Sequence, residues 1–111
     1  MDRYSYEEII ESVDEDFQAS FKLGDDHVAA TMRLLGDFYK EIIQSSPVEK
    51  LMFYIAICLY LHQKGYSFEH VQNGVKTVLA EIPFDSFKYD LETNEEKRLQ
   101  ADLEQVKSLL D

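Results

Sequence analysis

Cysteine, proline and glycine are all scarce in this sequence. The single cysteine, Cys58, excludes a disulfide within the chain, so a reducing cytoplasm is the compartment we expect. Only two prolines and four glycines occur among the 111 residues. So few turn-forming residues do not suit an all-β fold, which needs many turns, and they favour long helices.

Basic residues are also few. Eleven lysines and arginines face 22 acidic residues, which gives a net charge of −11 at neutral pH. This charge repels nucleic acids and anionic membrane surfaces, so we expect neither as a direct partner. A basic protein is the natural complement. The first residues also lack a basic stretch followed by an apolar one, so a secretory signal is not expected.

The longest apolar stretch of the chain runs from Leu51 to Leu61. Ser46 and Pro47 before it are typical of a helix start, and Gly65 after it is typical of a helix end. The run is shorter than the roughly 20 residues that cross a bilayer. A helix that is apolar on every side must then be surrounded by other helices. We predict a central helix over about residues 47–64.

Capping patterns and apolar spacings predict four more helices around this one. They begin at Ser5, near His27, at Ser67 and at Thr93, and Pro83 ends the fourth. In the second helix, Gly36 should admit a close neighbour, and a buried stripe is expected from Val28, Met32, Leu35, Tyr39, Ile42 and Ile43. With 45% hydrophobic residues, the chain can build its own core. The predicted fold is therefore all-α, a single-domain bundle of about five helices spanning residues 1–111.

No pattern in the sequence is typical of catalysis or of cofactor binding. Cys58 and His62 would share a helical face, but a closed zinc site needs four ligands and no further pair supplies them. Cys58 lies in the most apolar stretch, which suits a buried residue and not a reactive thiolate. We find no phosphate-binding loop and no nucleophile elbow. The sequence predicts no enzyme, no metal and no cofactor.

Acidic and aromatic residues are the remaining candidates for function. The first predicted helix carries a run of acids with no basic residue before Lys22. The run is either a solvated face or a surface kept negative for a positive partner. Tyrosines and phenylalanines gather at the predicted helix ends and in the segment 83–92. They either cap the ends of the bundle or anchor a partner protein.

The sequence resembles the small all-helical immunity proteins of bacterial polymorphic-toxin and contact-dependent growth inhibition systems. The resemblance covers nearly the whole chain, and four segments carry it: YSYEEII at 4–10, FYIAI at 53–57, QKG at 63–65 and EKRL at 96–99. It implies a cognate toxin domain, commonly a nuclease, that is held inactive in the producing cell by a tight complex. Such families have no catalytic motif, so the resemblance gives no residue a chemical role.

A nuclease must bind polyanions, so an acidic protein could occupy or flank its basic cleft. The acids that we expect to meet the basic surface are Glu8, Glu11, Asp14, Glu15 and Asp25. The aromatic anchors that we expect are Tyr4, Phe84, Phe87 and Tyr89.

Two other functions stay open at this point. The chain could be an acidic adaptor in a larger cytoplasmic complex, or a ligand-binding bundle with a cavity between its third and fourth helices. The apolar stripe of the last helix could serve a homodimer as well as the core.

Overall fold

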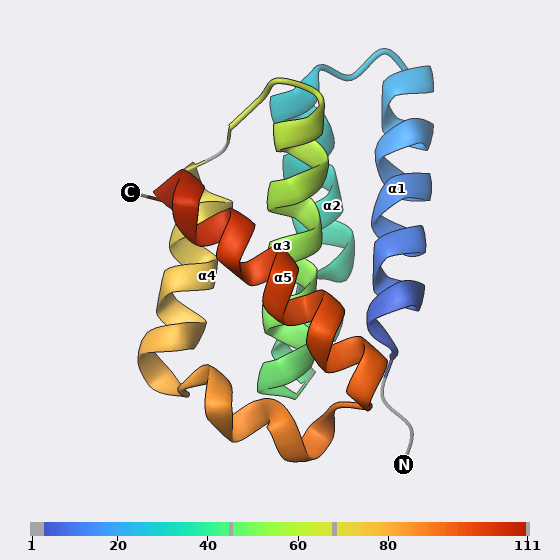
Figure 1. Ribbon diagram of the computed structural model, residues 1–111. Coiled ribbons are helices and arrows are strands. Elements are labelled where there is room, and N and C mark those ends of the chain that lie inside the picture. The colour runs from blue at the N-terminus through green and yellow to red at the C-terminus, as the bar shows by residue number, and fades with distance from the viewer. Residues whose placement is uncertain (1–3, 45, 68, 111) are drawn as a thin grey trace.

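The computed structural model describes residues 4–44, 46–67 and 69–110, and it describes no side chain at 37–44, 88–90 or 110. Five α-helices and a short 3₁₀ helix follow one another: α1 (Tyr6–Lys22), α2 (His27–Gln44), α3 (Pro47–Gln63), α4 (Glu69–Glu81), η1 (Phe84–Asp90) and α5 (Thr93–Leu110). Among the described residues there is no strand. The predicted all-α bundle is confirmed (Figure 1).

Helix α3 occupies the centre of the bundle, as its sequence predicts. It packs against α1, α2, α4 and α5, and α5 crosses in front of it in Figure 1. The side chain of Ser46 accepts a hydrogen bond from the backbone N–H of Glu49, and Pro47 takes the first helical position. At the other end Gly65 has a φ of +82°, the left-handed conformation that glycine adopts at low cost.

Helix α1 begins as the sequence predicts and is tied to α5. The capping box between Ser5 and Glu8 is complete. The backbone N–H of Tyr6 donates to Glu95 Oε2 at 2.9 Å, and its hydroxyl donates to Asp102 Oδ2 at 2.5 Å. Burial, followed by the hydrogen bond to Asp102, raises the pKa of Tyr6. These contacts fix the N-terminal end of α1 beside the N-terminal half of α5.

The predicted buried stripe of α2 is wrong at its first two positions. Val28 and Met32 are 45% and 56% exposed, whereas Ala30, Thr31 and Leu34 are buried. The buried hydroxyl of Thr31 is satisfied within the helix, since it donates to the carbonyl of His27 at 2.7 Å. Leu35 is half-buried. The side chains of Tyr39, Ile42 and Ile43 lie outside the described residues.

Helix α5 begins at Thr93, which was expected to be the N-cap. The backbone N–H of Glu92 instead donates to Glu95 Oε1 at 3.3 Å, so the cap lies one residue earlier than predicted. The segment before it contains the 3₁₀ helix η1. The α5 stripe of Leu99, Leu103 and Val106 is buried in the core, so these side chains are not available to a homodimer.

The glycine that admits a close neighbour is Gly74, and not Gly36 as predicted. A Cβ built at Gly74 would lie 2.6 Å from Cε1 of Tyr54, whereas one built at Gly36 meets no atom within 4 Å. The missing side chain at Gly74 lets α4 pack directly on the Tyr54 ring of α3.

Alanine at these two glycines should therefore have opposite effects on stability. We expect Gly74→Ala to lower the free energy of unfolding by about 1–3 kcal/mol, because the rigid Tyr54 ring must move. Gly36→Ala should raise it by about 0.5–1 kcal/mol through helix propensity alone. Urea unfolding of the two variants measures both values, and equal effects at the two positions would contradict the contact at Gly74.

Candidate functional site

The segment before α1 lies against the start of the central helix. The backbone N–H of Tyr4 donates to Glu49 Oε2 at 3.5 Å, and Glu49 itself is only 6% exposed. The Glu49 carboxylate also accepts the Ser46 hydroxyl at 3.1 Å. The ring of Tyr4 nevertheless stays 48% exposed. The chain is thus held in place here while an aromatic ring is presented at the surface.

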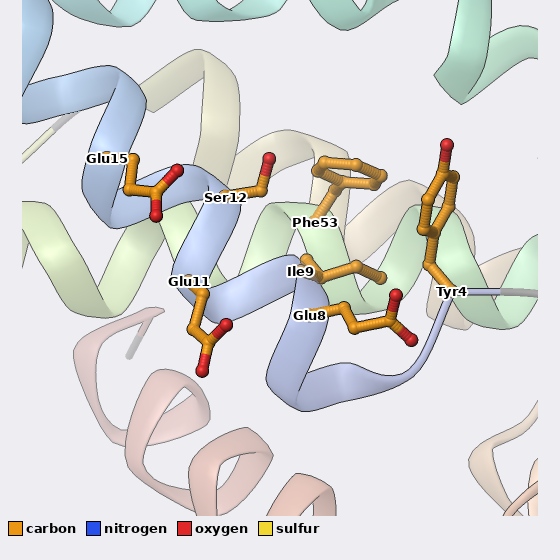
Figure 2. A pocket seen from close by; sticks show the side chains of 7 residues that line it. All are labelled: Tyr4, Glu8, Ile9, Glu11, Ser12, Glu15 and Phe53. Carbon is orange, nitrogen blue, oxygen red and sulfur yellow. The ribbon is translucent and has the colours of Figure 1, made fainter.

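A pocket of about 400 Å³ opens between this ring and α1 (Figure 2). We call it the acidic pocket. Its lining combines three carboxylates, two aromatic rings, an isoleucine and a serine: Tyr4, Glu8, Ile9, Glu11, Ser12, Glu15 and Phe53. Figure 2 shows the Glu8 carboxylate extending toward Tyr4, whereas the Glu11 carboxylate points away from the two rings. Four residues predicted from the sequence, Tyr4, Glu8, Glu11 and Glu15, therefore meet at one place.

The carboxylates come together because α1 repeats every 3.6 residues. Glu8, Glu11 and Glu15 are three and four positions apart, so they follow one side of the helix. Ile9 and Phe53 join the pocket from the core, and Phe53 is 2% exposed. Their part could not be read from the sequence, since it depends on how closely α1 packs on α3.

The chemistry of the acidic pocket suits a cationic side chain. Carboxylates accept hydrogen bonds from a guanidinium or an ammonium group, and a tyrosine ring attracts a cation over its face. Glu8 also accepts a hydrogen bond from the backbone N–H of Ser5 at 3.2 Å, so this carboxylate already has a fixed position. An arginine or lysine of a partner protein would meet groups that are held in place.

Asp14 and Asp25 lie away from the acidic pocket. Asp14 is on the other flank of α1 and accepts a hydrogen bond from Gln18 Nε2 at 2.9 Å. Asp25, in the turn after α1, accepts hydrogen bonds from the Ser20 hydroxyl and from Arg33 Nε. These hydrogen bonds hold the pKa of Asp25 below its ordinary value. These two hydrogen bonds give Asp25 a structural role in the turn between α1 and α2. Its part in binding a toxin stays a prediction.

Phe84 and Phe87 of η1 do not line the acidic pocket either. Phe87 is 3% exposed, and Phe84 is half-buried with its ring in an edge-to-face contact with Phe87 at 6.4 Å. These two rings hold η1 against the core, so a partner cannot reach Phe87 in this conformation. The side chain of Tyr89 lies outside the described residues.

The remaining candidates for chemistry have ordinary structural roles. Cys58 is 7% exposed, and burial raises the pKa of its thiol to about 12. It lines a pocket of about 120 Å³ where α3, α4 and α5 meet, well below the roughly 300–1,000 Å³ of small-molecule sites.

Within the described residues, no group of three or more His, Cys, Asp or Glu side chains could hold a metal ion. None of the described helices is long and apolar enough to cross a membrane.

Comparison with known proteins identifies a family over almost the whole chain. Residues 2–111 match the family described as Immunity protein Imm3. No curated protein and no solved structure matches the chain. The match includes Tyr4, α1 and every other element that shapes the acidic pocket.

Proposed function

The chain belongs to the Imm3 family of immunity proteins, and we propose that it neutralises its cognate toxin by binding it through the acidic pocket and the exposed face of α1. Membership of the family implies a toxin as the partner. We further propose that this toxin is a nuclease, and that the complex forms in the cytoplasm of the cell that makes both proteins.

The observation that carries the proposal is the convergence of Tyr4, Glu8, Glu11 and Glu15 in one pocket. Acids spread evenly over a surface would serve solubility alone. Here three of them line one hollow next to an exposed ring, and the whole chain has a net charge of −11. Opposite charge speeds the encounter with a basic protein, and a side chain seated among fixed groups slows its release.

The nuclease part of the proposal rests on charge. A nuclease must attract the phosphates of its substrate, so the surface around its cleft is basic. An acidic protein that covers this surface competes for the same positive charge. Toxins that act on a neutral substrate have no such requirement, and they would leave the acids of α1 without an electrostatic role.

Co-expression with the protein encoded immediately upstream tests the proposal. We expect the upstream domain to be lethal alone, and this chain to rescue growth and to purify with it in equal amounts. Purified toxin should cleave DNA or RNA, and adding this chain should stop the cleavage. A stable complex with a toxin that cleaves neither would refute the nuclease part alone. An upstream domain that is neither toxic nor bound would refute the whole proposal.

A further inference from the structure

The central helix is not covered equally on all sides. Between α1 and α5 lies a second hollow, of about 270 Å³, which we call the α1–α5 groove. Its floor is a stripe of α3 formed by Ala56, Leu59 and Tyr60, and the exposed Gln63 continues this stripe at the rim. The spacing of three, four and seven positions places these residues on one face of the helix. Leu59 and Tyr60 are only half-buried, so part of this face is open to solvent.

The shape of the groove follows from how its two walls are joined. Tyr6 donates hydrogen bonds to Glu95 and Asp102, and a guanidinium nitrogen of Arg98 lies 3.6 Å from Glu7 Oε1. The N-terminal end of α1 therefore contacts the N-terminal half of α5. From there α5 crosses the bundle diagonally while α1 runs along it, as Figure 1 shows. The two helices therefore diverge, and the floor widens with distance from the junction.

The two walls differ in charge. The α1 wall carries Glu11 and Asp14 beside the apolar Ile10 and Val13. On the α5 wall, Arg98 lies over the Tyr6 ring at 5.8 Å, and Asp102 accepts the Tyr6 hydroxyl. Arg98 and Asp102 carry opposite charges that offset each other, so Glu11 and Asp14 of α1 make the groove negative.

The floor is also held rigidly. Tyr60 stacks on Phe17 with ring centroids 4.4 Å apart and 4° between the ring planes. Burial and the neighbouring Asp14 raise the pKa of Tyr60 further above neutrality, and its protonated hydroxyl can donate a hydrogen bond. An apolar floor, a hydrogen-bond donor and an acidic wall are thus fixed in one place before any partner arrives.

We propose that the α1–α5 groove is a second docking site for the cognate toxin. It takes a segment in which an apolar side chain lies next to a lysine or arginine. The apolar side chain covers Leu59, and the cation pairs with Glu11 or Asp14. Glu11 lines both the groove and the acidic pocket, so a toxin seated on the pocket reaches the groove by straddling α1. This inference rests on the proposed function.

Tryptophan at the rim of the groove tests the inference. Gln63 and Gln105 are both exposed and line the groove from α3 and α5, whereas Gln100 is exposed on α5 outside it. A ring at either rim position fills the space that the toxin segment needs. We expect Gln63→Trp and Gln105→Trp each to raise the Kd for the upstream-encoded toxin domain by about tenfold or more. The matched control Gln100→Trp should change it by less than about twofold.

The outcomes separate this inference from the proposed function. If the unaltered protein binds the toxin and both rim variants bind it equally well, with unchanged melting temperatures, the groove is not a docking site and the proposed function stands. If the unaltered protein does not bind, the proposed function fails and the groove inference fails with it. Weakening at Gln63→Trp and Gln105→Trp, but not at Gln100→Trp, supports the groove.

Discussion

Reversing two charges on the exposed face of α1, Glu11→Lys with Glu15→Lys, is expected to weaken toxin binding by at least about 100-fold at low salt. Both glutamates line the acidic pocket and both are exposed. Each reversal removes an attraction and introduces a repulsion toward the same basic surface. Glu8 is left unchanged because its carboxylate closes the capping box of α1, so a loss of binding cannot be attributed to a frayed helix.

A matched variant controls for total charge. Glu81→Lys with Glu104→Lys alters two exposed glutamates outside the acidic pocket and the α1–α5 groove. Each pair changes the net charge from −11 to −7, since every replacement adds two units. Association rates and Kd measured at several salt concentrations compare the two pairs. If both pairs weaken binding equally, general attraction is responsible and the acidic pocket has no special part in binding.

Replacing Phe17 by alanine is expected to have the largest effect on stability, a loss of about 3–5 kcal/mol in the free energy of unfolding. The Phe17 ring is 0% exposed and stacks on Tyr60 of the central helix. Its removal deletes a buried aromatic contact and leaves a cavity between α1 and α3. A domain of this size has a total stability on the order of 5–15 kcal/mol, so a large share of it depends on this one ring.

Urea unfolding measures the effect, with the exposed neighbour Gln18 as the control position. Gln18→Ala should change the free energy of unfolding by less than about 0.5 kcal/mol, because its side chain lies at the surface. Phe17→Leu should cost less than Phe17→Ala, since it fills part of the cavity. If Phe17→Ala costs no more than Gln18→Ala, then α1 is not held on α3 through this ring.

Most of the fold could be predicted from local patterns. The capping box of Ser5 and Glu8 depends on residues three positions apart, and the start at Pro47 depends on the chain's own geometry. The central place of α3 follows from its composition, because a helix without a polar face cannot border on water. These features need no knowledge of what the helices pack against.

The predictions were wrong where one sequence pattern is compatible with two packing arrangements. Val28 and Met32 have the spacing of a buried stripe, but α2 turns Ala30, Thr31 and Leu34 inward. The spacing of apolar residues shows which residues share a helical face. It does not show which face packs against the neighbouring helices. The close approach was predicted at Gly36 but occurs at Gly74 for the same reason, since the atoms nearest to a glycine belong to another helix.

The sequence by itself determined the helices, the caps of α1 and α3, the net charge of −11 and the row of acids along α1. Only the tertiary structure decided which of these acids share a pocket with Tyr4 and Phe53, and that α1 and α5 leave a groove over Leu59. It also placed Phe87 in the core and gave Asp25 its partners Ser20 and Arg33. The physical reason is the range of the interactions. Caps and helical periodicity act over three or four residues, whereas a pocket depends on how helices distant in the chain pack together.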